Sequence, residues 1–238
     1  MSGTHAPSAG GTAAALAEAL GELMWPTRCV GCGEPGALLC PACEARLPWV
    51  SQLWACPTCG APFGWLVCTA CDASWDLRVV CALSYEGAAR RMVTLLKDAH
   101  ELRLAPYLAA AIAVALDETQ TDLDAIDGIC FVPATAEAFA RRGFDHMELV
   151  ARSLSRATGI PVADALARLP AADQRALGRE GRQKNLAGSV VVCADVAGAR
   201  LLLVDDVVTT GASMRACASA LLARGASGVM GAAAARVW

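Results

Sequence analysis

Apolar residues in the C-terminal two thirds of the chain follow two alternating patterns. Short unbroken apolar runs predict strands, because each run is too short for a buried helix and is bounded by turn residues. These strands are expected at residues 79–85, 129–132, 201–204 and 228–235, with a further short strand after Gly159. Strands that are apolar throughout and alternate with helices are typical of a parallel sheet covered on both faces. The pattern therefore predicts an α/β fold with a mostly parallel sheet and flanking helices.

The segments between these runs show helical patterns. Helices are expected at residues 88–98, 104–117 and 212–224, and a fourth follows Gly143. In the fourth, apolar residues recur at helical spacing on one face: Met147, Val150, Ala151 and Leu154. Residues 168–189 are polar and predict a loop.

Two segments of different character precede this α/β part. Residues 1–25 begin as a tail of small residues and continue as a short Ala/Leu helix at 13–24. Residues 26–75 are rich in Cys, Pro, Gly and Trp. We therefore divide the chain into an N-terminal tail with a short helix (1–25), a Cys-rich segment (26–75) and an α/β domain (76–238).

Composition restricts the class of protein. Of the 238 residues, 55% are hydrophobic and 18% are charged, and 51 are alanine. The longest stretch without a charge, residues 47–71, is long enough to cross a bilayer, but it holds four Cys, three Pro and two Gly and cannot be a regular apolar helix. This excludes a transmembrane protein, and the high hydrophobicity excludes a disordered one. A net charge of −3 provides no general basic surface for nucleic acid.

The 12 cysteines are the unusual feature of the composition. Eight form four Cys-x2-Cys turns: Cys29, Cys32, Cys40, Cys43, Cys56, Cys59, Cys68 and Cys71. Two such turns complete one tetrahedral site, so the eight predict two structural Zn2+ ions in a double zinc ribbon. Pairing in sequence order and interleaved pairing both stay open, as does iron–sulfur ligation. The other four, Cys81, Cys130, Cys193 and Cys217, have apolar neighbours and are expected in the core.

Disulfides are the other interpretation of clustered cysteines. No Lys or Arg precedes Arg28, so the N-terminus lacks the positive start of a secretory signal. The chain is therefore expected in the cytoplasm, where thiols stay reduced and are available to a metal.

A glycine pattern inside the Cys-rich segment imitates a dinucleotide-binding motif. Gly31, Gly33 and Gly36 read G-x-G-x-x-G. That motif needs a strand before it and a helix after it, and neither is predicted here. We therefore reject it.

The sharpest motif is an apolar strand followed by two acids and a turn of small polar residues, at 201–213. Backbone N–H groups at a helix N-terminus receive anions, and Gly211 lets the backbone approach closely. The turn lies at the carboxyl end of a strand, where open α/β sheets bind ligands. Asp205 and Asp206 would repel a phosphate alone, so they indicate ligand hydroxyls or a Mg2+ ion bound with the phosphate. A simple helix cap would not explain the two acids.

Residues 201–213 resemble the 5-phosphoribosyl 1-diphosphate (PRPP) signature of type I phosphoribosyltransferases. The resemblance implies that Asp205 and Asp206 are the catalytic acids and contact the ribose 2′ and 3′ hydroxyls. It implies that the following residues bind PRPP, the last five around its 5-phosphate: Val207, Val208, Thr209, Thr210, Gly211, Ala212 and Ser213.

A double zinc ribbon followed by such a domain is similar to the ComF family, named for competence, the uptake of DNA. Further matching stretches are Leu47-Pro48, Tyr85-Glu86-Gly87, Leu96-Lys97, Val132-Pro133, Arg142-Gly143-Phe144, Gln174 and residues 182–185. This chain has Asp145-His146 where the family usually has Asn-Gln, and Gly188-Ser189 where an aromatic residue is usual.

Pyrophosphate departure requires positive charge near the leaving group. Residues 168–184 hold five cations and two acids, a balance of +3 that suits a lid over pyrophosphate or, alternatively, a solvated loop. The pyrophosphate candidates are Lys97, Arg141, Arg142, Arg179, Arg182 and Lys184. His100 and His146 are interpreted as surface or structural residues rather than acid–base groups.

The resemblance predicts a Mg2+-dependent protein that binds PRPP and is linked to DNA uptake. If active, it is a phosphoribosyltransferase, a glycosyltransferase that moves a pentosyl group to an unidentified acceptor. We expect the Cys-rich segment to lie over the carboxyl edge of the sheet, near Asp205.

Two other functions stay open: a regulator that senses PRPP without turnover, and a non-catalytic module for nucleotides or single-stranded DNA, with a competence-machinery protein as a further partner. Residues 29–71 carry one Arg and two acids, which disfavours phosphate binding. Aromatic residues in this segment could stack on bases: Trp49, Trp54, Phe63 and Trp65.

Overall fold

A computed structural model describes residues 26–71, 75–168 and 190–238. The helix expected at 13–24 and nearly all of the polar loop expected at 168–189 lie outside the described residues. The chain divides into two compact units, residues 1–46 and 47–238. The first four cysteines of the Cys-rich segment lie in the first unit, and the other four share the second unit with the sheet. The predicted domain boundaries at residues 25 and 75 stay a prediction.

The described part of the first unit is a small loop structure around four cysteines. The backbone closes on itself through the N–H of Cys29, which donates to the carbonyl of Glu34 at 2.8 Å, and the N–H of Val30, which donates to that of Leu38 at 2.9 Å. One short helix, α2 (Pro41–Glu44), begins directly after Cys40, with proline at its first position.

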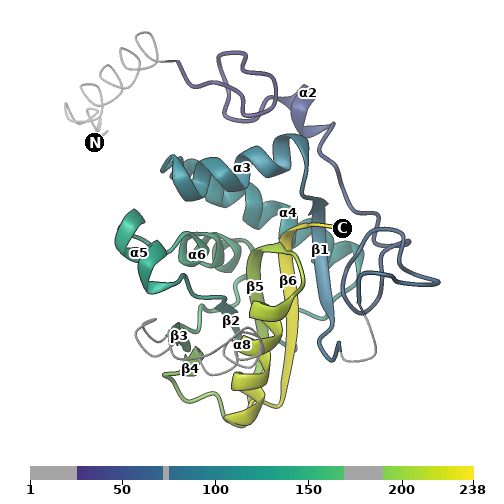
Figure 1. Cartoon of the computed structure of the whole chain (residues 1–238), viewed down its shortest axis with the longest axis vertical. Helices are drawn as coiled ribbons and strands as arrows, with labels where there is room; N and C mark the ends of the chain where they lie inside the picture. Colours follow the sequence, from purple (N-terminus) through teal and green to yellow (C-terminus); the bar gives the residue numbers. More distant parts are fainter. Residues whose placement is uncertain (1–25, 72–74, 169–189) are drawn as a thin grey trace, which may run out of the picture. The chain divides into compact units, whose positions relative to one another are not determined.

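A four-stranded parallel sheet forms the centre of the second unit (Figure 1). Its order is β1 (Val79–Ser84), β6 (Gly228–Arg236), β5 (Arg200–Val208) and β2 (Gly128–Phe131). Its strands consist largely of Val, Leu, Ile and Ala, and β1 and β2 are buried along their whole length. This confirms the predicted α/β fold with a mostly parallel sheet and flanking helices.

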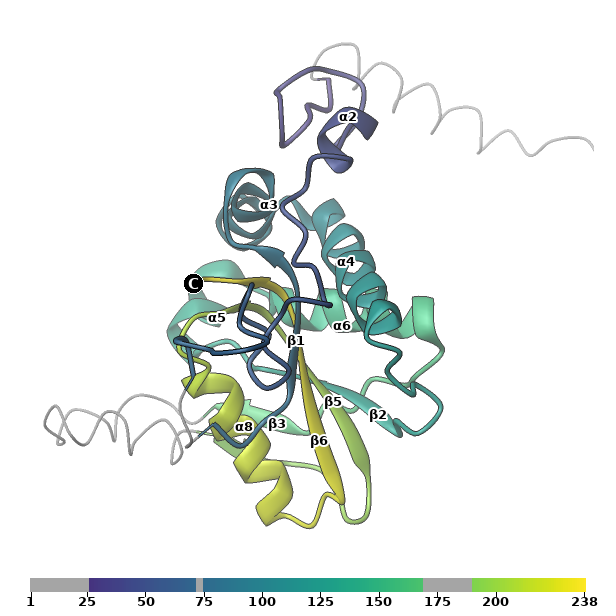
Figure 2. The ribbon, with the colours of Figure 1, turned by 90° about the vertical axis from the view of Figure 1, so that its right-hand side faces the viewer.

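Helices cover both faces of this sheet (Figure 2). α4 (Ala105–Glu118) and α6 (His146–Thr158) pack on one face, and α8 (Ala212–Ala223) packs on the other. α3 (Gly87–Asp98) leads through a short 3-10 turn, η1 (Leu102–Leu104), into α4. These helices match the expected ones closely, because their apolar faces repeat at helical spacing.

Smaller elements differ from the sequence prediction. α5 (Ala136–Arg142) was not expected; it has no buried residue, so no apolar pattern marks it. The strand expected after Gly159 is reduced to a single parallel bridge between Ile129 and Val162. Instead, β3 (Leu166–Arg168) and β4 (Val190–Val192) form a separate antiparallel pair.

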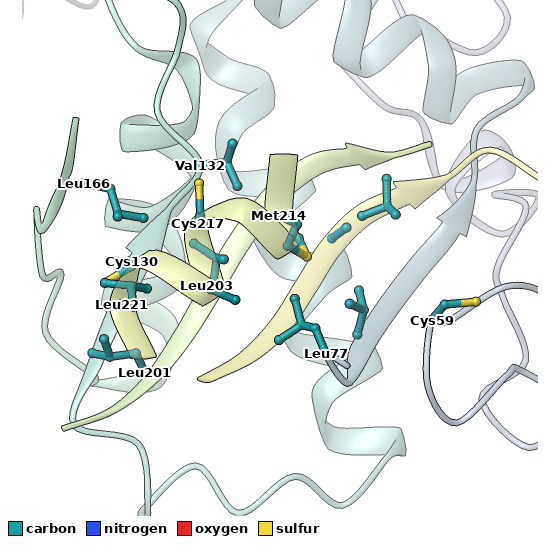
Figure 3. Packing of buried hydrophobic residues seen from close by; sticks show 14 of the residues in the cluster. Cys59, Leu77, Cys130, Val132, Leu166, Leu201, Leu203, Met214, Cys217 and Leu221 are labelled. Atoms are coloured by element: carbon teal, nitrogen blue, oxygen red, sulfur yellow. The ribbon is translucent and has the colours of Figure 1, made fainter. Parts of the chain in front are cut away.

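The apolar layer beneath α8 continues onto the second group of cysteines (Figure 3). Leu203, Met214 and Leu221 pack there with Cys59 and Leu77. Of the four cysteines expected in the core, Cys81, Cys130 and Cys217 are fully buried. The prediction is wrong for Cys193, which is exposed just beyond the end of the short strand β4.

Among the described residues, no helix combines the length and the apolar character that a membrane span requires. The predicted cytoplasmic location stays a prediction.

Candidate functional site

The predicted acid pair lies inside strand β5 rather than after it. β5 continues through Asp205 and Asp206 to Val208, and α8 begins at Ala212. Val208 is 1% exposed, and its carbonyl accepts from the N–H of Val237 at 3.0 Å. The turn between β5 and α8 is therefore residues 209–211, at the carboxyl end of an inner strand of the sheet, where open α/β sheets bind ligands.

This turn presents small polar groups at the N-terminus of the 12-residue helix α8. Thr209 and Thr210 are exposed, and the Thr210 hydroxyl accepts a 3.4 Å hydrogen bond from the N–H of Ala212. Gly211 caps α8 with φ +69°, a left-handed conformation that favours glycine. The first N–H groups of a helix have no intrahelical partner and attract anions. Residues 209–213, here called the phosphate loop after the ligand predicted for them, therefore place small polar side chains beside the first N–H groups of α8.

Asp206 is buried between two positive or polar partners from other elements. Its side chain pairs with Lys97 of α3 and accepts a 2.6 Å hydrogen bond from Nε2 of His146 in α6. Burial raises the pKa of Asp206, but the hydrogen bond from His146 and the charge of Lys97 outweigh it and hold the pKa at about 2. Asp206 is therefore a carboxylate at neutral pH.

Asp205 lies in the opposite electrostatic situation. Burial and the adjacent charge of Asp206 raise its pKa well above the ordinary value, while the Asp206 N–H, which donates to Asp205 Oδ1 at 2.9 Å, acts against this. A second charge on this pair is therefore unfavourable without a cation or a hydrogen-bonding ligand. The pair is suited to hold hydroxyl groups or a divalent ion.

His146, interpreted from the sequence as a surface or structural residue, is buried and contacts Asp206. Nη1 of Arg142 lies 2.9 Å from its Nδ1, while its Nε2 faces Asp206. An arginine can only donate, so Nδ1 accepts and the ring proton sits on Nε2, which donates to Asp206. Arg142, His146 and Asp206 therefore form one hydrogen-bonded chain from α5 through α6 to β5.

Asp145 positions that histidine. Its Oδ1 accepts from the N–H of Met147 at 2.8 Å and caps α6, and its Oδ2 accepts from the N–H of Ala134 at 2.7 Å. Gly143 ends α5 with φ +79° just before it. The sequence carried a signal for this arrangement: an aspartate directly before a predicted helix is a typical N-cap, and it fixes which residue begins the first turn.

The predicted pyrophosphate cations have different surroundings. Lys97 pairs with Asp206, whereas Arg142 contacts His146, and Nε of Arg142 is buried without a hydrogen-bond partner. Arg141 is exposed and lies 3.6 Å from Asp98. Arg168, the first of the five cations in the predicted polar loop, donates to the carbonyl of Pro133 at 2.9 Å. Arg179, Arg182 and Lys184 lie outside the described residues.

A cavity of about 750 Å³ opens between the phosphate loop and the second group of cysteines. Thr209 and Thr210 line one side of it. The rest of its wall comes mainly from residues 61–71 and from aromatic and basic side chains that were not predicted as site residues: Trp75, Arg215, Arg236 and Trp238. Residues 61–71 thus lie at the carboxyl edge of the sheet beside the phosphate loop, where the Cys-rich segment was expected.

Trp75 lines this cavity and packs against the phosphate loop. Its Nε1 donates to the carbonyl of Leu77 at 2.6 Å, and its ring lies against Gly211, where a Cβ atom would overlap it. The guanidinium of Arg215 lies 5.2 Å from the ring centroid. Gly211 is therefore required twice, by its backbone conformation and by the ring packed on it.

The eight clustered cysteines form two groups in sequence order. The first four-cysteine group is Cys29, Cys32, Cys40 and Cys43, and the second four-cysteine group is Cys56, Cys59, Cys68 and Cys71. Sulfur pairs lie 3.6 to 3.8 Å apart. Four sulfurs bound at about 2.3 Å around one tetrahedral ion lie about 3.8 Å apart. Both groups could therefore hold a zinc ion, and the interleaved pairing is wrong.

Backbone N–H groups stabilise the thiolate form of Cys29 in the first four-cysteine group. Burial raises the pKa of Cys29, but N–H donors, among them those of Cys40 and Gly31 at 3.3 Å, lower it to about 6. A Cβ atom on Gly31 would overlap the Cys43 sulfur. Gly31, the first glycine of the rejected dinucleotide-binding pattern, therefore leaves room for the Cys43 sulfur.

Comparisons with known proteins place the chain. No protein-family model matches it. A solved structure titled "Analysis of an invariant aspartic acid in HPRTs-alanine mutant" overlaps 56% of this chain and 66% of its own, with 13% identity and a TM-score of 0.33. Proteins named DNA utilization protein YhgH, from Salmonella typhi and Escherichia coli (strain K12), are each 30% identical over 217 residues, which is 86% of this chain and 94% of the relative. The chain therefore belongs to the family of DNA utilization protein YhgH.

Proposed function

We propose that this chain is a ComF-type protein that binds PRPP together with Mg2+ at the carboxyl end of β5. One observation carries the proposal: Asp205, which is half-buried, and Asp206, which is buried, have opposed pKa shifts and lie near the end of β5, whose following turn leads into a glycine-capped helix N-terminus. An anion alone would not need the acids, and a cation alone would not need the helix N-terminus. A sugar phosphate with free hydroxyls uses both.

The residues divide between the parts of this ligand. Thr209, Thr210 and the first N–H groups of α8 would receive the 5-phosphate, with Ser213 in the first turn. Asp205 and Asp206 would accept hydrogen bonds from the ribose hydroxyls. Two carboxylates are hard oxygen donors, which suits Mg2+, and that ion would neutralise charge on the pyrophosphate.

Cations around Asp206 would act on the pyrophosphate end. Lys97 balances Asp206 without ligand and is 27% exposed at its side chain, so it can reach a leaving group. Arg142 holds His146 and keeps a buried Nε donor for an anion. Transfer of the ribosyl group would place positive charge on the sugar, beside the Asp206 carboxylate. The aromatic cavity beside the loop would receive a planar acceptor.

We further propose that each four-cysteine group holds one structural zinc ion. The thiolates require a reducing compartment, so this proposal places the chain in the cytoplasm.

Calorimetry with Mg2+ and PRPP tests the binding proposal. We expect heat for the wild type, loss of at least about 2 kcal/mol of binding free energy in Asp205→Asn and in Asp206→Asn, and no loss in the exposed control Asp117→Asn. Absence of heat in the wild type, or unchanged affinity in both acid variants, would overturn the proposal. Pyrophosphate release with a panel of bases then separates an enzyme from a binder or sensor.

Single-stranded DNA binding is the second candidate function. Large apolar side chains of the second unit are exposed, among them Trp54, Phe63 and Trp65 at 44%, 71% and 48%. The relatives are named for DNA utilization. Residues 47–71 carry no Lys or Arg, so binding through them would rest on stacking and would depend little on salt. A gel shift with single-stranded DNA that Phe63→Ala and Trp65→Ala weaken would favour this function; unaltered binding in both would count against it.

A further inference from the structure

Arg236 is a buried arginine at the end of β6, beside the point where β5 passes into the phosphate loop. It is 1% exposed. Its Nη1 donates to the carbonyls of Val208 at 3.0 Å and Val237 at 2.5 Å, and also to that of Thr209. One guanidinium nitrogen therefore holds two consecutive carbonyls, the last of β5 and the first of the phosphate loop.

Two consecutive carbonyls on one donor do not fit strand geometry. In a strand, successive carbonyls point to opposite sides, so only every second one faces a given neighbour. Val208 follows this rule, because its carbonyl also accepts from the N–H of Val237, directly after β6. The carbonyl of Thr209 faces the same side and accepts from Arg236. The backbone therefore departs from strand geometry at Thr209, the first residue of the phosphate loop.

The position of these carbonyls fixes the direction of the next two N–H groups. In a trans peptide group the C=O and the N–H point in opposite directions, and none of the described peptide bonds is cis. The N–H groups of Thr209 and Thr210 therefore both point away from Arg236. Neither donates to an acceptor in the described part of the chain. Successive N–H groups that face one side of a turn form a concave site for an anion.

The guanidinium also supports the other end of the same turn. It lies 5.9 Å from the ring centroid of Trp75, within the range of a cation–π contact. That ring packs on Gly211, the N-cap of α8. Arg236 therefore contacts the first residue of the turn 209–211 directly and the last one through Trp75.

We propose that Arg236 is a positioning residue that keeps the N–H groups of the phosphate loop directed toward an anion. It binds the carbonyls of Val208 and Thr209 on its own side, which leaves the N–H groups of Thr209 and Thr210 on the side of the ligand. This role rests on the proposed function, because it requires a ligand phosphate at the loop. Without the arginine, the peptide group between Thr209 and Thr210 loses its donor and can turn its carbonyl toward the phosphate, which repels it.

Calorimetry with two probes tests this role: ribose 5-phosphate for the phosphate loop, and pyrophosphate with Mg2+ for the acid pair and its cations. Arg236→Met fills the buried position but donates no hydrogen bond. It should bind ribose 5-phosphate at least about tenfold more weakly than the wild type, and pyrophosphate equally well. Arg236→Lys, whose ammonium group has three donors, should recover most of the lost affinity.

Arg200→Met is the matched control, because it removes the same charge from the exposed start of β5, at the opposite end of the strand. It should bind both probes as the wild type does. Ribose 5-phosphate binding that Arg236→Met leaves unchanged would overturn the role of Arg236 alone. Equal losses for both probes would show a general change of the site and would overturn it too.

A wild type that binds neither probe would instead contradict the proposed function, and the role of Arg236 with it. If Arg236→Met does not fold, amide spectra decide. Ribose 5-phosphate must then move the amide protons of Thr209 and Thr210 in the wild type and in Arg236→Lys. Unmoved signals of both residues in the wild type would show that these N–H groups do not face the phosphate.

Discussion

Residues at the site depend on partners from other helices and strands, and several of these partners lie far away in the sequence. Asp206 pairs with Lys97 and accepts a hydrogen bond from His146, and these two residues come from two different helices. His146 in turn needs Arg142 on its other nitrogen. Each of these polar groups is buried or half-buried, so losing one partner leaves another unsatisfied, which is the costly outcome.

The histidine chain gives a prediction about His146. Replacing it with glutamine keeps one acceptor for Arg142 and one donor for Asp206, so we expect a loss of less than about 1 kcal/mol in unfolding free energy. His146→Ala leaves both partners unsatisfied and should lose about 1–3 kcal/mol. Urea unfolding measures both. Equal losses in the two variants would show that packing, rather than the two hydrogen bonds, matters.

The raised pKa of Asp205 gives a prediction about stability and pH. Below the pKa of an unfolded aspartate, about 3.9, the carboxyl is protonated in both states and has no effect. Above it, the unfolded chain ionises first, so the wild type loses stability as pH rises towards the folded pKa. Asp205→Asn should therefore unfold at a higher temperature than the wild type at about pH 8 but not at about pH 4, without added Mg2+.

Asp117→Asn is the control for that comparison, because Asp117 is exposed at the end of α4. A lower melting temperature of Asp205→Asn at both pH values would mean that the ionised Asp205 stabilises the fold. A gain in stability joined to a loss of PRPP binding would identify Asp205 as a residue kept for function.

The strand and the helices that form the site contribute residues at or near their ends. β5 supplies the acids, α8 its N-terminus, α6 its first residue and α3 its last turn. Parallel strands bring their carboxyl ends to one edge, so the loops that follow them share that edge. The phosphate loop depends on Gly211, the point where α8 begins and Trp75 packs.

Gly211→Ala tests that dependence, with Gly143→Ala as its match. Both glycines have a positive φ, +69° and +79°, so both changes carry a backbone cost of about 1–2 kcal/mol. A Cβ on Gly143 meets nothing within 4 Å, whereas one on Gly211 overlaps the Trp75 ring. We expect Gly211→Ala to lower the unfolding free energy by at least about 1 kcal/mol more than Gly143→Ala. Equal losses of unfolding free energy in the two variants would mean that the Trp75 ring moves aside without cost.

The whole molecule carries its two four-cysteine groups in separate compact units. Because they share no ligand, their metal ions should leave independently. We expect two zinc ions per chain, released to a chromogenic chelator in two steps, and one ion with one step in Cys32→Ser. A single cooperative release of both ions would show that the two groups are linked.

Much of this molecule follows from local sequence. Strands β1, β2, β5 and β6 and their covering helices were predicted because apolar residues repeat at the spacing of each element. The acid pair and the phosphate loop are consecutive, and the Cys-x2-Cys turns are short-range, so the sequence alone indicated both kinds of site. α5 escaped prediction because it buries nothing.

Only the tertiary structure decided what depends on distant contacts. It grouped the cysteines in sequence order, placed His146 on Asp206, 60 positions away, and set the buried Arg236 against the carbonyls of Val208 and Thr209. No local sequence pattern identifies the distant partner of any of these residues. The spacing of apolar residues indicates which face of an element is buried. The partner of a buried polar group depends instead on which distant segments the fold brings together.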